Sequence, residues 1–238
     1  MKSQDPNQEH LQYIINLYTE GKLQKALSES NKLLEKFPTS IILFNIAGAC
    51  NAALMQFDAA IESYKQALRI NPNYADAYFN LGNALKDMDE FEEAIESYQQ
   101  ALKINPNYAE VYNNMGNVLK DMDEFEEAIE SYQQALKINP NYAEVYNNMG
   151  NVLKDMDEFE EAIESYQQAL KINPNYAEVY NNMGNVLKDM DELEEAIESY
   201  QQALKINPNY AEVYNNMGVA LKDMDELEEA IESYQQAL

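Results

Sequence analysis

The chain has one histidine, His10, and one cysteine, Cys50, and these are the first candidates for acid–base or nucleophilic chemistry. A histidine without a partner nucleophile is usually a packing residue, and we expect this of His10. Cys50 takes a small apolar position, which predicts a buried thiol. No Ser/His/Asp or Cys/His set, phosphate loop, zinc spacing or calcium loop is present. We therefore expect no enzyme activity, no metal and no cofactor.

Asparagines are the residues whose spacing best suits recognition. An amide has one acceptor and two donors, so it can bond both the N–H and the C=O of an extended peptide. We expect a peptide-binding groove that is lined by these amides and by glutamates of the same helix face. Its residues are Asn80, Asn83, Asn113, Asn114, Asn117, Asn147, Asn148, Asn151, Asn181, Asn182, Asn185, Asn215, Asn216, Glu110, Glu144 and Glu178. The alternative is that duplication has merely copied a soluble residue.

These residues recur because the chain is a tandem repeat. The stretch from Ala109 to Tyr142 returns letter for letter from Ala143 to Tyr176, a period of 34 residues. Such self-similarity is typical of a stacked helical solenoid. After a polar tail at residues 1–6, we expect seven repeats, the last one truncated. Their ranges are 7–40, 41–74, 75–108, 109–142, 143–176, 177–210 and 211–238.

Within one repeat, apolar residues at steps of three and four predict two helices, A and B, and Pro140 ends helix B. Two pairs have the spacing of a capping box, Asn107 with Glu110 and Asp123 with Glu126. The small residues Gly116, Ala128 and Ala135 lie on the packed faces. We expect them to let the helix backbones approach closely.

The pattern Tyr112-x2-Met115-Gly116-x2-Leu119, followed by Ala128-x3-Tyr132 and then Pro140, resembles the tetratricopeptide repeat (TPR). This resemblance implies an all-α, right-handed superhelical solenoid of helix-turn-helix repeats. It also implies that helix A lines a concave groove holding peptides or partner proteins. The asparagines are similar to those in the TPR superhelix of O-linked N-acetylglucosamine transferases.

The sequence departs from the family at the turn between the helices. Later copies have aspartate, such as Asp123 and Asp157, where the family usually has glycine and the first copy has Gly21. Aspartate tolerates left-handed backbone better than most residues, so we expect the turn to survive.

The net charge of −26 comes from the later repeats, because residues 1–74 hold seven acidic and seven basic side chains. A field of this sign repels phosphates, so we expect neither nucleic acid nor anionic membrane as a partner. The glutamates Glu110, Glu144 and Glu178 instead favour an extended peptide or protein with basic side chains. The start lacks the apolar run of a signal peptide, and we expect a cytoplasmic protein.

The leading hypothesis is a protein-interaction scaffold. Two alternatives stay open: a structural, self-assembling or engineered array without a specific ligand, and the substrate-recruiting N-terminal arm of a larger transferase. The chain stops at Leu238 inside its last repeat, and we expect a truncated piece. A bare last helix B also predicts end-to-end contacts between copies.

Overall fold

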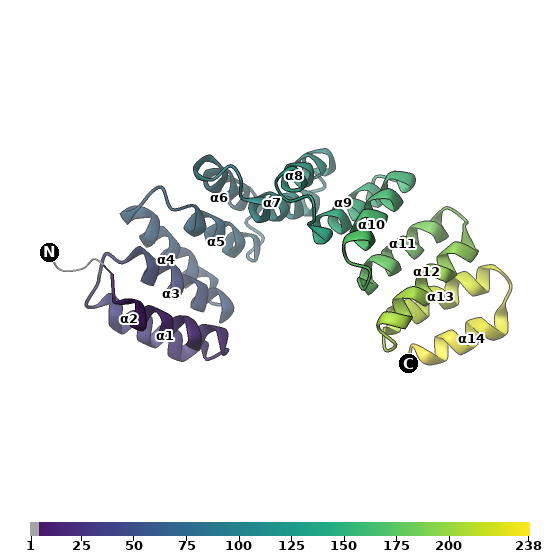
Figure 1. The fold of residues 1–238 in the computed structure, drawn as a ribbon, viewed down its shortest axis with the longest axis horizontal. Coiled ribbons are helices and arrows are strands. Elements are labelled where there is room, and N and C mark those ends of the chain that lie inside the picture. Colours follow the sequence, from purple (N-terminus) through teal and green to yellow (C-terminus); the bar gives the residue numbers. More distant parts are fainter. Residues whose placement is uncertain (1–4) are drawn as a thin grey trace. The chain divides into compact units, whose positions relative to one another are not determined.

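The computed structural model describes residues 5–238. Across this range it contains 14 α-helices and no strand, alternating as helix A and helix B of each repeat (Figure 1). The A helices are α1 (Gln8–Thr19), α3 (Ile41–Ala53), α5 (Ala75–Lys86), α7 (Ala109–Asp121), α9 (Ala143–Asp155), α11 (Ala177–Asp189) and α13 (Ala211–Asp223). The B helices are α2 (Leu23–Leu34), α4 (Phe57–Ile70), α6 (Phe91–Ile104), α8 (Phe125–Ile138), α10 (Phe159–Ile172), α12 (Leu193–Ile206) and α14 (Leu227–Gln236). The predicted all-α class with helical-hairpin repeats is confirmed.

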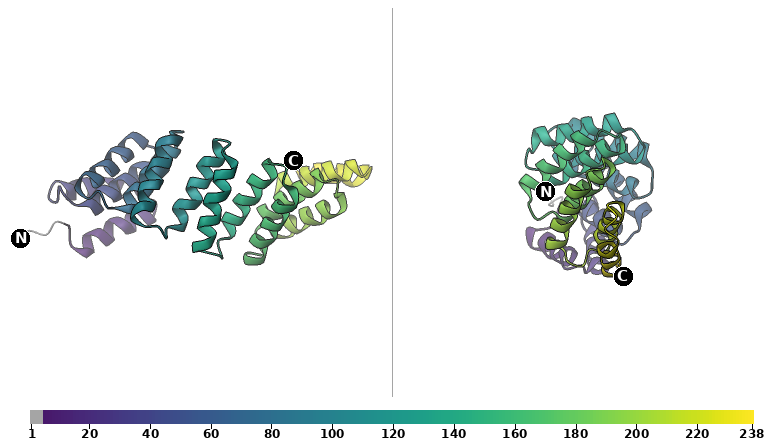
Figure 2. Two further views of the ribbon diagram at one scale, coloured as in Figure 1. Left: turned by 90° about the horizontal axis from the view of Figure 1, so that it is seen from above. Right: turned by 90° about the vertical axis from the view of Figure 1, so that its right-hand side faces the viewer.

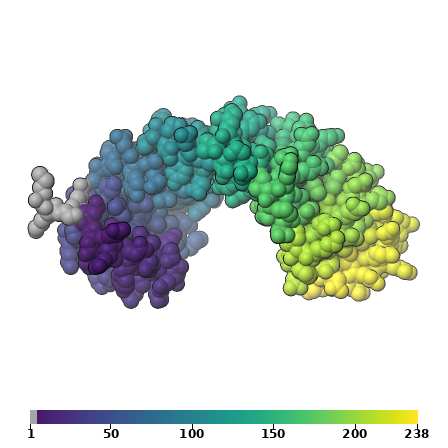
Figure 3. All heavy atoms as spheres, in the orientation of Figure 1, coloured from purple at the N-terminus to yellow at the C-terminus, as the bar shows by residue number. Residues whose placement is uncertain are grey.

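The helices form two compact units, Met1–Val118 and Leu119–Leu238, called unit 1 and unit 2 below. Within unit 2, α9 packs on α10 and α11 packs on α12, and each hairpin contacts the next one along the chain (Figure 2). Side chains fill the spaces between the helices of each unit (Figure 3). No helix in residues 5–238 is long and apolar enough to cross a bilayer.

The expected tail at residues 1–6 falls largely outside the described residues, which begin at Asp5. Pro6 is buried, and the Asp5 carboxylate accepts a hydrogen bond from the Ser40 hydroxyl. These two residues therefore contact the first repeats.

The turn between helices A and B has the same geometry in each later repeat. Asp157 has φ 59°, its N–H donates to the Lys154 carbonyl at 3.0 Å, and the Glu158 N–H donates to the Leu153 carbonyl at 2.9 Å. These two bonds form a Schellman motif that satisfies the last carbonyls of helix A. The expectation that aspartate accepts left-handed backbone here is confirmed.

The predicted capping boxes are wrong. The N-cap of α8 is Glu124, one residue after Asp123, and it makes no side-chain capping bond. In the identical next copy the N-caps are Tyr142 for α9 and Glu158 for α10, and neither makes a side-chain capping bond. Asp157 takes the left-handed position that ends α9, one residue before the N-cap of α10. It is therefore part of the motif that closes one helix instead of the one that opens the next.

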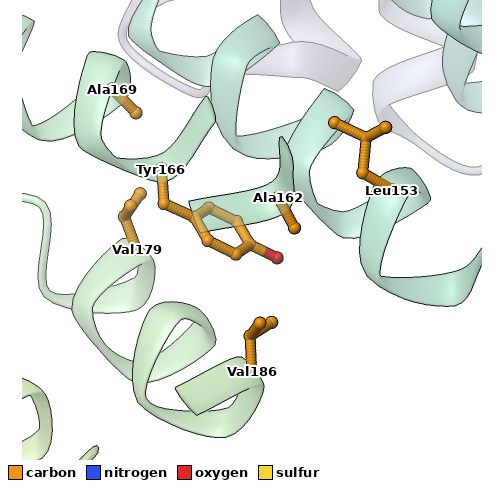
Figure 4. Packing of buried hydrophobic residues seen from close by; sticks show 6 residues of the cluster. All are labelled: Leu153, Ala162, Tyr166, Ala169, Val179 and Val186. Atoms are coloured by element: carbon orange, nitrogen blue, oxygen red, sulfur yellow. The ribbon is translucent and has the colours of Figure 1, made fainter. Parts of the chain in front are cut away.

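The core of a repeat is built around a tyrosine of helix B. In unit 2 the Tyr166 ring is fully buried beside Ala162 of α10 and Val179 and Val186 of α11 (Figure 4). A Cβ at Gly150 of α9 would lie 2.6 Å from Cε1 of this ring. The prediction that small residues permit the close packing is confirmed at these equivalent positions.

The two residues first considered for chemistry lie in different surroundings. Cys50 is buried, as predicted, and burial raises the pKa of its thiol to about 11, so the reactive thiolate is scarce at neutral pH. His10 is exposed. The expectation that His10 is a packing residue is wrong, because no described helix precedes α1 to cover it.

Candidate functional site

The predicted groove residues lie at three depths on the surface formed by the A helices. The glutamates Glu144 and Glu178 are exposed, whereas Asn148 and Asn182 are half-buried. Asn147 and Asn181 are buried, with 2% of their surface exposed. This surface, called the helix A surface below, is therefore layered, with carboxylates outermost and amides beneath.

Amide hydrogen bonds connect successive A helices within each unit. In unit 2, Nδ2 of Asn182 donates to Oδ1 of Asn147 at 3.0 Å and to Oδ1 of Asn151 at 3.2 Å. Asn216 donates in the same way to Asn181 at 3.0 Å. These bonds join consecutive repeats, so the asparagines have a structural role that composition alone did not indicate.

Unit 1 contains related bonds. Asn80 donates to Oδ1 of Asn45 at 3.0 Å. Asn114 donates to Oδ1 of Asn83 at 2.8 Å. The second bond differs because Phe79 takes the place that Asn147 and Asn181 occupy in later copies. The repeats are thus still joined by an amide hydrogen bond although phenylalanine replaces one of the two acceptor asparagines.

In two repeats of unit 2, a buried tyrosine of helix B donates a hydrogen bond to an asparagine of helix A. The Tyr166 hydroxyl donates to Oδ1 of Asn151 at 2.8 Å, and Tyr200 donates to Asn185 at the same distance. Burial raises the pKa of both phenols well above the ordinary value, so they stay protonated donors at neutral pH. The sequence interpretation missed this pair, although a fixed separation of 15 residues was a signal.

Part of the predicted site needs correction. Asn113, Asn147 and Asn181 are each 2% exposed and do not line an open groove. In unit 2 this position faces the next A helix, because Asn147 accepts a hydrogen bond from Asn182 and Asn181 accepts one from Asn216. Asn215 on α13 is exposed. The remaining predicted residues have exposed or half-buried side chains: Asn80, Asn83, Asn114, Asn117, Asn148, Asn151, Asn182, Asn185, Asn216, Glu110, Glu144 and Glu178.

Acidic groups dominate the electrostatics of the helix A surface. In unit 1 the Tyr108 hydroxyl donates to Oδ1 of Asp76 at 3.3 Å. Burial, together with the negative charges of Asp76 and Glu110, raises the pKa of Tyr108 to about 12. In unit 2 the Lys154 ammonium lies 3.2 Å from the carboxylate of the adjacent Asp155, so the lysine charge is locally matched. The helix A surface therefore presents carboxylate and amide oxygens, which can accept hydrogen bonds.

The described residues offer no arrangement for metal chemistry. Within residues 5–238, no group of three or more His, Cys, Asp or Glu side chains is placed to hold a metal ion. The acid-rich turns around Asp157 point to helix termination instead.

Comparisons with known proteins agree with this geometry. Two curated relatives match short segments. A probable UDP-N-acetylglucosamine–peptide N-acetylglucosaminyltransferase of Arabidopsis thaliana is 34% identical over 71 residues, which is 30% of this chain and 7% of the relative. A small glutamine-rich tetratricopeptide repeat-containing protein of Dictyostelium discoideum is 41% identical over 63 residues, 26% of this chain and 19% of the relative. The matches thus span less than a fifth of either relative.

A solved structure is also similar. YrrB, a TPR protein with an unusual peptide-binding site, is 26% identical with a TM-score of 0.61, over 74% of this chain and 91% of YrrB. Residues 41–238 match the family model of the cilia and flagella-associated protein 70 C-terminal domain, a TPR domain. The repeat pattern, the helical hairpins and this match agree: the chain belongs to the tetratricopeptide-repeat family, through the family of that C-terminal domain.

Proposed function

We propose that this chain is a protein-interaction scaffold that holds an extended partner segment with basic side chains on the helix A surface. The observation that carries the proposal is the layering of exposed glutamates above half-buried amides in successive repeats. YrrB, which has a peptide-binding site, shares the fold over most of its length. A scaffold role also fits a family whose members are generally non-catalytic.

Asn182 retains hydrogen-bonding capacity after joining two repeats. Asn182 uses its two Nδ2 hydrogens on Asn147 and Asn151, which leaves its Oδ1 as an acceptor. A guest peptide presents backbone N–H groups that such acceptors can bind. We therefore propose that the asparagine Oδ1 atoms accept hydrogen bonds from the guest backbone, while the Nδ2 groups hold consecutive repeats together.

In this proposal the glutamates give the surface its preference for positively charged guest side chains. Glu144 and Glu178 are exposed, and we propose that they pair with lysine or arginine of the guest. Exposed ion pairs contribute about 0.2–1 kcal/mol each and weaken with salt. Binding would therefore depend on several repeats engaged at once.

A titration with matched peptides tests the charge preference. A lysine-rich extended peptide should bind more tightly than a glutamate-rich peptide of equal length, with affinity falling as salt rises, in isothermal titration calorimetry. Glu144→Gln with Glu178→Gln should weaken the lysine peptide. Glu160→Gln with Glu194→Gln, which removes the same charge from exposed positions on the B helices, should have less effect. Equal binding of the two peptides contradicts the proposal.

Ester-substituted peptides test the amide role without altering the protein. Replacing one backbone N–H of the lysine peptide by an ester oxygen removes a donor, and should weaken binding by about 1 kcal/mol at an engaged position. An ester at the peptide terminus serves as the control. If no internal ester changes the affinity, the guest backbone is not held by the asparagines.

A second candidate is favoured by one comparison. The Arabidopsis relative is a probable peptide N-acetylglucosaminyltransferase, and its match to this chain covers 7% of its length. We propose as the alternative that this chain recruits substrates for a larger transferase. A full-length transcript that lacks a catalytic domain would remove this candidate.

A further inference from the structure

Unit 2 has a series of recesses between successive B helices. The first groove lies between α8 and α10, above α9, and has a volume of about 320 Å³. Tyr146, Met149 and Leu153 of α9 form an apolar floor, and Glu161 and Glu164 of α10 stand at the rim. Both glutamates are exposed. The groove thus combines apolar depth with a negative edge.

The same groove recurs at the next two junctions of unit 2. The second, about 320 Å³, has Met183 in its floor and Glu195 and Glu198 at its rim. The third, of about 420 Å³, has Met217 in its floor and three carboxylates around it, from Glu226, Glu229 and Glu232. Three sites of one chemistry therefore follow one another at intervals of a single repeat.

The chemistry of the lining selects an occupant. None of the residues lining these three grooves is lysine or arginine, so no described cation neutralises the rim carboxylates from within. Lysine and arginine carry an apolar stem and a charged head, and commonly lay the stem on apolar surface while the head stays in water. A neutral apolar side chain would leave the carboxylates unmatched, and an anionic one would be repelled.

We propose that these three grooves bind lysine or arginine side chains of a partner protein segment that lies across the B helices of unit 2. The stem of each inserted side chain contacts the floor tyrosine and methionine, and its charge meets the rim glutamates of that groove. Adjacent grooves engaged by one segment reinforce one another, because the second side chain binds as an intramolecular step. This surface is separate from the helix A surface of the proposed function and uses different carboxylates.

Methionine methyl NMR locates the bound peptide. Only the groove methionines, Met149, Met183 and Met217, should shift when a peptide with spaced lysines is added to protein labelled at the methionine methyl carbons. Met156, Met190 and Met224, in the turns between helices, are internal controls. Absence of binding, or shifts confined to the turn methionines, overturns the proposal.

Two altered peptides test separately whether binding needs the apolar stem of lysine and its charge. Norleucine in place of lysine keeps the stem without charge, and diaminopropionic acid keeps the charge on a short stem. Both should shift the groove methyls less than the lysine peptide at equal concentration. Equal shifts with norleucine would indicate a purely apolar site, and equal shifts with diaminopropionic acid a purely electrostatic one; either result contradicts the proposal.

Charge-matched variants distinguish binding in the grooves from binding on the helix A surface. The quadruple variant E161Q/E164Q/E195Q/E198Q should weaken the lysine peptide by up to about fivefold for each pair lost. The control E144Q/E178Q/D155N/D189N removes four charges from the A helices and should leave the groove methyl shifts in place. If both variants reduce the groove methyl shifts equally, net charge alone explains the binding and the groove proposal fails. If the quadruple groove variant leaves the calorimetric affinity unchanged and only the control weakens it, the peptide lies on the helix A surface, and the groove proposal fails while the proposed function stands.

Discussion

At the level of single residues, the contact between a glycine of helix A and a tyrosine of helix B determines how closely the two helices pack. Gly150 faces the ring of Tyr166, and a Cβ there would lie 2.6 Å from Cε1. The equivalent contact recurs at Gly184 with Tyr200. The ring is fully buried and cannot swing away easily. Even one methyl group at this glycine therefore requires the helices to move.

We expect Gly150→Ala to lower the free energy of unfolding by about 1–3 kcal/mol, as overpacking of a core does. Urea denaturation followed by circular dichroism measures this loss. In a Tyr166→Leu background the ring is absent, so the same glycine change should cost much less. A similar loss in both backgrounds would show that the contact is not its cause.

Two neighbouring asparagines show that the sequence did not predict burial residue by residue. Asn147 and Asn148 are neighbours on the polar side of helix A, and periodicity predicted a surface role for both. The structure buries Asn147 and leaves Asn148 half-buried. A helical wheel shows which residues share a face, but not where the next repeat covers its edge. Burial at that edge depends on packing between helices, which the sequence pattern does not contain.

At the level of elements, the turn after helix A decides where one helix ends and the next begins. The left-handed residue is Gly21 in the first repeat, Met55 in the second and aspartate in later copies such as Asp157. Methionine has a Cβ that strains this conformation and no short polar group to relieve it. Met55 is 74% exposed, so little packing offsets the strain.

Replacing Met55 with glycine should raise the free energy of unfolding by about 1 kcal/mol, because glycine adopts positive φ without a steric penalty. Thermal denaturation of the two proteins measures the gain. Asp157→Gly should give a smaller increase, since aspartate tolerates this region better. Gly21→Ala should be destabilising. A loss of stability in Met55→Gly would refute the assignment of strain.

The helices themselves were predictable, whereas their caps were not. Apolar spacing and the repeat period indicated two helices per copy, and the structure has α9 and α10 in the copy that begins at Ala143. The capping prediction failed because a three-residue spacing fits Asp123 and Glu126 equally well whether Asp123 opens or closes a helix. Only its φ of 60° distinguishes the two.

At the level of the whole molecule, a repeated buried phenol makes stability depend on alkaline pH. The helix B tyrosines Tyr98, Tyr132, Tyr166 and Tyr200 are fully buried, and burial raises the pKa of each. An unfolded tyrosine releases its proton near pH 10, so above that pH the folded state holds more protons than the unfolded state. Stability is therefore complete below about pH 10 and declines above it.

We expect the free energy of unfolding to fall above about pH 10, with a slope of up to about 1.4 kcal/mol per pH unit for each buried tyrosine. Urea titrations at a series of alkaline pH values measure the slope. Tyr166→Phe with Tyr200→Phe removes two of these phenols and should make the decline shallower. An unchanged slope in this variant would assign the alkaline loss to other groups.

The inter-repeat bond from Asn182 to Asn147, repeated from Asn216 to Asn181, has an evolutionary consequence. Each of these repeats contains both an asparagine that donates to the preceding repeat and an asparagine that accepts from the next one. A duplicated gene segment of one period therefore encodes a repeat that can bond to the repeats on both sides. Unequal recombination could then insert or delete a copy without creating a mismatched interface. Array length would vary among descendants more readily than the sequence of any single joint.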